Sequence, residues 1–277
     1  MSGLEIKTPD QLRTMRRAGL VVAEVHAAIR DAAAPGVTTG ELDQLARNIL
    51  ARHGAGSSFL NYGEAWGYPP YPGVICISVN EEVVHGIPGP RALAEGDLVS
   101  VDFGAIVDGF HGDGAITFGV GALSEPDQRL SDVTRASLWD GIAAARLGGR
   151  VTDISHAIET SIRSRPERYG ILKDYTGHGI GSTMHQVPDV PNVGRPGRGP
   201  RLVEGLALAV EPMVTLGSAV GVTLDDEWTL VTKDGSHAAH WEHTITVTRH
   251  GLWVLTAPDG GEAELAARGL PFGPLAD

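Results

Sequence analysis

The two halves of the chain repeat one another, and this duplication constrains the fold more than any single motif does. In the first half His85 precedes Gly96 and an acid in an apolar stretch, and in the second half His185 precedes Gly205 and another such acid. Six residues lead from Gly96 to Asp102, and six lead from Gly205 to Glu211. This parallel placement argues against a chance likeness between two ordinary helix-loop-strand units. We therefore expect the two halves to fold alike.

Each half also carries a matching helical pattern. Apolar residues recur on one helical face in residues 42–50 and, in the same register, in residues 154–162. Thr38 and Glu41 form a capping box, which fixes the start of the earlier helix. Both helices are expected to end near a glycine, the later one near Gly170. Helices are predicted over residues 8–32, 38–54, 125–147 and 152–166, with strands and turns over most of the rest.

These patterns predict an α+β fold. If the halves pack about a pseudo-two-fold axis, their strands join into a curved, antiparallel-rich sheet with the helices outside. The acids and histidines of both halves would then converge at its centre. We expect a single domain over residues 1–277, with pseudo-repeats at roughly 8–123 and 124–255. Hydrophobic residues make up 42% of the 277, which suffices for a substantial core.

Four acids lie in apolar segments that resemble buried strands. They are Asp102, Asp113, Glu211 and Glu242. An ionised carboxylate in a protein core is very costly unless a cation or several donors neutralise it. One hard divalent cation rarely needs four carboxylates, whereas a two-metal site uses bridging ones and ends with its charges roughly balanced. The pattern therefore favours a metal cluster.

Composition argues against several other classes of protein. The chain has 34 acids and 22 bases, and its net charge of −12 argues against a specific nucleic-acid partner. The lone Cys76 cannot form an internal disulfide, and the sequence has no Cys-x-x-Cys pair for a structural zinc. Residues 1–17 do not resemble a secretory signal, and no apolar run is long enough to span a membrane. We expect a cytoplasmic protein without a membrane partner.

Five ordered motifs give the chain a resemblance to the type I methionine aminopeptidases, which have the pita-bread fold. The motifs are Asn80–Pro88 (NEEVVHGIP), Asp102 with Asp108–Asp113 (DGFHGD), Gly177–Gly181 (GHGIG), Glu211–Met213 (EPM) and Glu242–Thr244 (EHT). Any one motif alone is weak, but five in order are a strong signal, and they extend the resemblance over roughly residues 5–255. It implies a single catalytic domain that removes the initiator methionine from nascent polypeptides when the second residue is small.

The resemblance also implies two divalent metal ions, Co, Mn, Fe or Zn, and a set of ligands. The ligands are Asp102, Asp113, His178, Glu211 and Glu242. Asp113 and Glu242 are expected to bridge, because carboxylates can join cations ~3.5–4 Å apart. One imidazole tilts selectivity away from Ca and Mg. A water activated by both metals would attack the first peptide bond, with Glu211 as the general base.

Further residues follow from the same resemblance. His85 and His185 are expected to contact the substrate and the tetrahedral intermediate, and so to act both in binding and in catalysis. The pocket for the methionine side chain is expected from Tyr68, Tyr71, Cys76 and Trp228. Aromatic rings and a thiol suit an unbranched thioether. No ligand role is expected for His111, or for His243, which should face away from its neighbour Glu242 on an alternating strand.

Two residues depart from the family's pattern. Met184 stands before His185 where bacterial relatives often carry Phe, which predicts a softer pocket wall. His240 stands where Gln is common, two residues before Glu242, so both side chains should share one face of a strand. His240 then either supports the metal ligands or titrates alongside them, and it could shift the pH profile.

Three alternatives keep the fold but change the function or the subclass. A prolidase or Xaa-Pro aminopeptidase would share the metal ligands and cut before proline, but such enzymes usually carry a large extra N-terminal domain. A ribosome-associated binding protein of this fold would typically lose metal ligands. A type II enzyme would carry a long helical insertion in the second half. The expected partners are the N-termini of nascent peptides and the expected state is a monomer, while ribosome contact is left open.

Overall fold

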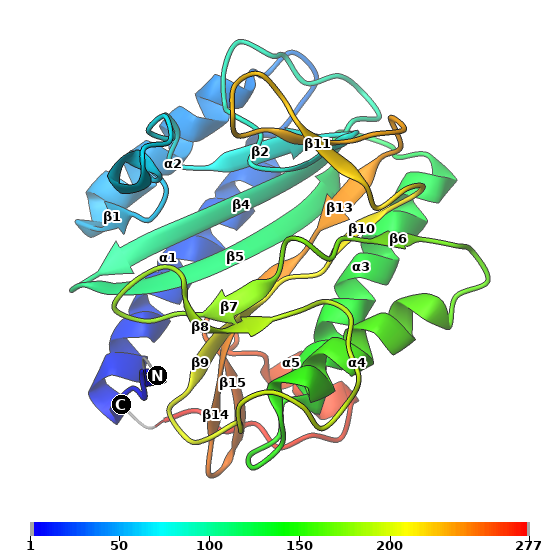
Figure 1. Ribbon diagram of the computed structural model, residues 1–277. Helices are drawn as coiled ribbons and strands as arrows, with labels where there is room; N and C mark the ends of the chain where they lie inside the picture. The colour runs from blue at the N-terminus through cyan, green and yellow to red at the C-terminus, as the bar shows by residue number, and fades with distance from the viewer. Residues whose placement is uncertain (1–2, 276–277) are drawn as a thin grey trace.

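The computed structural model describes residues 3–275 (Figure 1). The helices are α1 (Pro9–Ala32), α2 (Thr39–His53), the 3-10 helix η1 (Glu64–Trp66), α3 (Glu125–Ala144), α4 (Val151–Arg163) and α5 (Glu262–Ala267). The strands of the largest sheet are β1 (Gly56–Ser57), β2 (Cys76–Val79), β4 (Leu98–Val107), β5 (Phe110–Gly119), β7 (Gly177–Gly179), β8 (Gln186–Val190), β9 (Ala207–Val210), β14 (Glu242–Thr248) and β15 (Gly251–Val254). The remaining strands are β3 (Glu82–Val84), β6 (Gly170–Ile171), β10 (Met213–Thr215), β11 (Gly221–Thr223), β12 (Leu230–Thr232) and β13 (Ala238–His240).

The largest sheet has the order β1-β4-β5-β14-β9-β7-β8, with β2 also paired to β4 and β15 to β14. Every pairing in it is antiparallel. The strands β5 and β14 pair at the centre of this sheet. On one side β4 pairs with β5, and on the other side β9 pairs with β14, so the strand order is similar on both sides of the centre. The predicted α+β class and the curved antiparallel sheet with outer helices are confirmed (Figure 1).

The first half builds its helical layer from α1 and α2. The α1 helix packs on β4 and β5 and passes behind them in Figure 1. Its Gly19 lies against the backbone of Leu255, and a Cβ there would be 2.1 Å from the Leu255 carbonyl oxygen. The predicted capping box of Thr38 and Glu41 starts α2, and Gly54 ends it in the left-handed conformation (φ 60°). Local sequence therefore sets both ends of α2.

In the second half, α3 and α4 pack against each other and cover the sheet beside β9 and β14. The prediction for the end of α4 was wrong, because the helix ends at Arg163 and Gly170 begins β6. Pro166 explains the early end, since it disfavours helical backbone at the preceding residue. The short α5 is not among the helices expected from the sequence.

Two hydrophobic clusters separate the helices from the sheet. One joins α1 and α2 to β2 and β4, with Val25, Ile29 and Phe103 fully buried. The larger one joins α3 and α4 to β9 and β14, with Leu138 and Ile158 fully buried. The opposite face of the sheet is thereby left free to carry polar side chains. Within residues 3–275, no helix is long and apolar enough to cross a membrane.

Candidate active site

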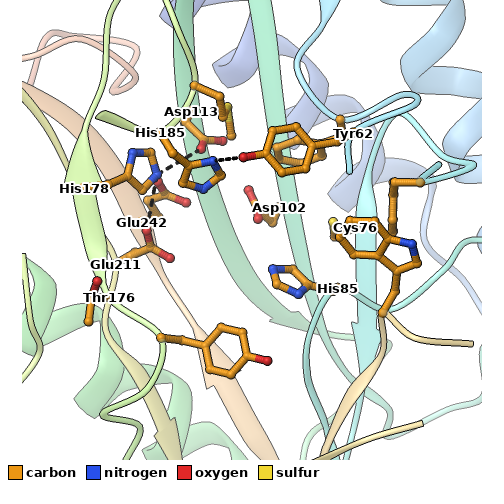
Figure 2. Close-up of a pocket in the computed structure, with 15 residues that line it drawn as sticks. Tyr62, Cys76, His85, Asp102, Asp113, Thr176, His178, His185, Glu211 and Glu242 are labelled. Atoms are coloured by element: carbon orange, nitrogen blue, oxygen red, sulfur yellow. Dashed lines mark hydrogen bonds and ion pairs between the residues drawn. The ribbon is translucent and has the colours of Figure 1, made fainter. Parts of the chain in front are cut away.

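Strand register brings three of the predicted metal ligands onto one face of the sheet. Asp102 of β4 and Glu242 of β14 both pair with Ala115 of β5, one from each side. Directly paired residues point to the same face, and Asp113 lies two residues before Ala115, so its side chain shares that face. Three carboxylates from adjacent strands therefore converge on one point, as Figure 2 shows.

The remaining two predicted ligands come from β7 and from the end of β9. His178 pairs with Ala209, and Glu211 follows Ala209 by two residues, so both side chains point to the carboxylate face. The Nε2 atom of His178 lies 3.5 Å from Oε1 of Glu211 and 3.8 Å from Oδ2 of Asp113. The five predicted ligands line a cavity of about 160 Å³ together with His85 and His185.

Burial in this cluster disfavours the ionised form of its acids. Burial raises the pKa of Asp113 to about 7. Burial, and then the charge of Asp113, raise the pKa values of Asp102, Glu211 and Glu242 well above their usual range. Such a cluster favours a bound cation, because positive charge would let the carboxylates ionise in place.

Unpaired atoms in and beside this cluster fit divalent metal ions. Among residues 3–275, Oδ1 of Asp102, Oε1 of Glu242 and Nε2 of His240 are buried without a hydrogen-bond partner. Burial lowers the pKa of His178 to about 3, so its imidazole is neutral and its Nε2 can act as a ligand. Its Nδ1 lies 2.9 Å from the carbonyl oxygen of Gly179, which favours a proton on Nδ1 and leaves Nε2 free. Carboxylate oxygens with imidazole nitrogen suit Mn, Fe, Co or Zn.

The two histidines predicted to act on the substrate lie on opposite sides of the cavity (Figure 2). The Nδ1 atom of His185 is 2.5 Å from the hydroxyl oxygen of Tyr62. The centroids of the His185 and His178 rings are 4.2 Å apart. His85 has a left-handed backbone (φ 61°), a strained conformation that is uncommon outside glycine. Burial lowers the pKa of His85 to about 4. Burial also lowers the pKa of His185 and so favours its neutral form, in which each ring can donate one N–H.

Three of the four predicted pocket residues line the same cavity. Tyr71 is buried and donates its hydroxyl proton toward the carbonyl oxygens of Ile75 and Gly86. Cys76 is buried beside it, and Trp228 packs its ring at 5.3 Å from the Tyr71 ring. The structure does not place Tyr68 there.

Tyr68 lies instead in an outer groove that leads to the cavity. Its side chain is 58% exposed and packs near Trp228. Four further residues that line the inner cavity were not expected from the sequence. They are Phe59, Tyr62, Tyr175 and Thr176. The aromatic residues at 59–71 were a signal for the first two, but only the fold brings Tyr175 across from the second half.

The other histidines and Met184 also have defined positions. His111 lies outside the cavity, with Nδ1 2.9 Å from the Ser58 hydroxyl oxygen. His243 faces away from it and contacts the Thr256 hydroxyl through Nδ1 at 2.8 Å. Met184 lines the cavity, in agreement with its predicted place in the pocket wall. His240 is buried on the ligand side, with Nε2 3.8 Å from Oε2 of Glu242.

Comparison with known proteins places the chain in a family. Residues 13–249 match metallopeptidase family M24. Methionine aminopeptidase 1 of Mycobacterium tuberculosis is 53% identical over 255 residues, which cover 90% of this chain and 94% of that protein. The chain belongs to the methionine aminopeptidases of family M24. The predicted resemblance is thereby confirmed, and membership of a metallopeptidase family implies the use of divalent metal.

Solved structures of the family agree with this assignment. The crystal structure of methionine aminopeptidase from Thermotoga maritima is 40% identical, with a TM-score of 0.87, and the match covers 92% of this chain and 99% of that chain. A prolidase from Pyrococcus furiosus is 18% identical, with a TM-score of 0.71, and the match covers 91% of this chain but 65% of that chain. The prolidase therefore shares the pita-bread fold alone.

Proposed function

We propose that the protein removes the initiator methionine from nascent polypeptides whose second residue is small. One observation carries the proposal: a buried cluster of carboxylates and imidazole lines the same small cavity as a group of aromatic rings packed with Cys76 and Met184. Such a cavity accepts one unbranched apolar side chain next to a polar reaction centre. Relatives named methionine aminopeptidase support the choice of methionine.

The metal centre is proposed to hold two divalent ions, Co, Mn, Fe or Zn. The proposed ligands are Asp102, Asp113, His178, Glu211 and Glu242, with Asp113 and Glu242 shared between the ions. When bound, these ions would supply Lewis acidity and lower the pKa of water, so that a nucleophile forms at neutral pH. The raised pKa values of the buried acids support a requirement for bound cations.

The residues of the chain move the protons and hold the substrate. Glu211 borders the cavity and is the proposed general base, which takes the proton of the attacking water and passes it to the leaving amine. The Tyr62 hydroxyl lies within hydrogen-bond distance of Nδ1 of His185, and we propose that it donates to this nitrogen, which would leave the ring proton on Nε2. His185 and His85 then donate to the carbonyl oxygen as negative charge develops there.

The aromatic side of the cavity sets the proposed specificity for the first residue. Tyr71, Cys76 and Trp228 would enclose the methionine side chain, and sulfur makes favourable contacts with ring edges. Tyr68 contacts the peptide farther out, in the groove. The second residue is proposed to lie near His85 and the buried Val84, and only a small side chain is expected to fit there.

Rates of cleavage of short peptides test the proposal. Met-Ala-Ser should be cut 10–200-fold faster than Leu-Ala-Ser, because a methylene-sized misfit in an apolar pocket costs ~1–3 kcal/mol. Met-Lys-Ser should not be cut, because its second residue is too large. Faster cleavage of Ala-Pro-Ser than of Met-Ala-Ser would instead identify a proline-specific enzyme. No cleavage of any peptide after loading with each metal would favour a binding protein.

The cellular setting completes the proposal. We propose that the protein is a monomeric cytoplasmic enzyme that acts on the N-termini of nascent peptides. Its single catalytic domain is proposed to extend over residues 1–277 and to consist of two related halves. The similar order of strands on both sides of the sheet centre supports the two halves. The net charge of −12 argues against a specific nucleic-acid partner. Gel filtration and cell fractionation test the oligomeric state and the location.

A further inference from the structure

His240 lies at the metal-binding cluster in a fixed position. It is the last residue of β13, where it pairs with Met213 of β10, and its side chain is 2% exposed. The Thr117 hydroxyl accepts a hydrogen bond from the backbone N–H of His240 at 3.0 Å and donates one to the backbone carbonyl oxygen of His240 at 2.7 Å. The backbone is thereby tied to β5, so the imidazole has little freedom to turn away from the cluster.

The imidazole presents an unused nitrogen to two carboxylates. Its Nε2 lies 3.6 Å from Oε2 of Glu211 and 3.8 Å from Oε2 of Glu242. Both separations are too long for a hydrogen bond, and Nε2 has no hydrogen-bond partner within residues 3–275. Two ligand atoms that each lie about 2.0–2.2 Å from one cation are roughly 3–3.5 Å apart. The observed separations exceed that range by a few tenths of an ångström, which a bound ion would close.

His178 provides an internal standard for these distances. Its Nε2 lies 3.5 Å from Oε1 of Glu211 and 3.8 Å from Oδ2 of Asp113. The two oxygens of Glu211 therefore each face one imidazole, at nearly equal separations. Two groups of ligand atoms result, each with one imidazole, and both groups include Glu242. The first group is Asp113, His178 and Glu242. The second group is Glu211, His240 and Glu242.

We infer that His240 is an additional metal ligand, which binds through Nε2 the divalent cation that Glu211 and Glu242 hold. The inference rests on the proposed two-metal centre, and it changes that centre from one imidazole for two ions to one imidazole for each. A second nitrogen donor favours Mn, Fe, Co or Zn over Mg or Ca at both positions. His240 thus makes the centre more selective than a glutamine at the same place would, because an amide binds such metals through a harder oxygen.

Proton NMR of the cobalt-loaded protein tests the inference without any peptide substrate. Each histidine that binds paramagnetic Co²⁺ through Nε2 shows its Nδ1–H proton as a strongly shifted signal that is lost in D₂O. The unsubstituted protein should show two such signals. His240→Gln and His178→Gln should each remove one. His156→Gln, which changes an exposed histidine on α4, should remove none.

Metal affinity gives a second, independent readout. His240→Gln should weaken the binding of one Co²⁺ in calorimetric titration by at least 10–100-fold, the loss seen when even a supporting partner of a ligand is removed. Circular dichroism of the metal-free variant checks its fold. If the variant does not fold, the signal count of the unsubstituted protein decides alone.

Two exchangeable signals, with one lost in His240→Gln, support His240 as a ligand. One signal in the unsubstituted protein, or two that persist in His240→Gln, overturn the inference. The outcome is separate from that of the peptide assays. A protein that shows two ligating histidines but cuts no peptide would keep this metal centre and lose the proposed function.

Discussion

The two halves deliver their side chains to the cavity in different ways. Residues 8–123 supply Asp102 and Asp113 from one hairpin of two paired ten-residue strands, β4 and β5. Residues 124–255 supply His178 from β7, Glu211 from the position just after β9, and Glu242 from the start of β14, three segments that come together only in the folded sheet. Both imidazoles near the carboxylates, those of His178 and His240, also come from this half.

This difference suggests separate contributions from the two halves: the first fixes the positions of carboxylates, and the second affects which metal would bind. The continuous ladder between β4 and β5 fixes two oxygen donors by local pairing. The second half supplies the imidazoles of His178 and His240, which as nitrogen donors in the proposed centre would favour transition metals over Ca and Mg. The histidines proposed to act on the substrate are shared, with His85 from the first half and His185 from the second. Comparing equivalent residues of the two halves therefore tests how evenly the halves contribute.

The largest expected effect is the loss of a shared carboxylate. Asp113→Ala in the first half and Glu242→Ala in the second should both abolish cleavage of Met-Ala-Ser, because each is proposed to contact both ions. Asp108→Asn is a matched control in the same hairpin, since Asp108 is exposed and forms a surface ion pair with Arg17. Activity and metal content by elemental analysis are the measurements. Full turnover in either Ala variant would remove that residue from the centre.

The next effect concerns the shared histidines. His185→Ala should lower kcat by about 10²–10³ while keeping the metal content, because it removes a donor to the developing oxyanion. Tyr62→Phe should give a smaller loss, since it removes only the group that orients the His185 ring. His111→Ala, outside the cavity, is the control. Loss of metal in His185→Ala would show that His185 is a ligand, and the division between ligands and donors would be wrong.

A third comparison uses two helical glycines. At Gly19 of α1 a Cβ would lie 2.1 Å from the Leu255 carbonyl oxygen, whereas at Gly141 of α3 it would lie 2.6 Å from Cγ1 of the Ile158 side chain. A side chain can yield more easily than backbone, and alanine favours a helix over glycine by ~1 kcal/mol. Gly19→Ala should therefore destabilise the protein by roughly 2 kcal/mol or more, and Gly141→Ala by less. Urea unfolding of both variants measures this, and equal losses would contradict it.

The last expected effect is on stability in acid. Burial lowers the pKa of His26 on α1 to about 3, and its Nε2 lacks a hydrogen-bond partner within residues 3–275. Between pH 6.5 and 3 the unfolded chain binds a proton at His26 that the folded protein does not, so stability is lost as pH falls through this window. His26→Leu should recover about 1.4 kcal/mol per pH unit below pH 6.

Exposed His156 on α4 gives the matched control for this effect. The free energy of unfolding of His26→Leu, His156→Leu and the unsubstituted protein is measured at several values between pH 7 and 4.5. Only His26→Leu should show a weaker dependence on pH. The same slope in all three proteins would mean that His26 takes up a proton in the folded state.

Much of the fold and of the proposed site could be predicted from sequence. The capping box at Thr38, the positive-φ glycine at Gly54 and the acids on apolar strands are local signals. Each acts over a few residues through backbone conformation or the cost of burying charge, so it survives without knowledge of the partners. The family's ordered motifs added His178, which no local pattern indicates.

Contacts between distant segments were decided only by the tertiary structure. Tyr62 contacts His185, and His240 lies next to Glu211, because sheet order and strand register bring those segments together. Tyr68 was expected in the pocket, but its loop leaves it in the outer groove. Side-chain chemistry and local backbone preference are properties of the sequence alone. Which atoms face one another across the cavity depends on how both halves pack, and that is a property of the whole fold.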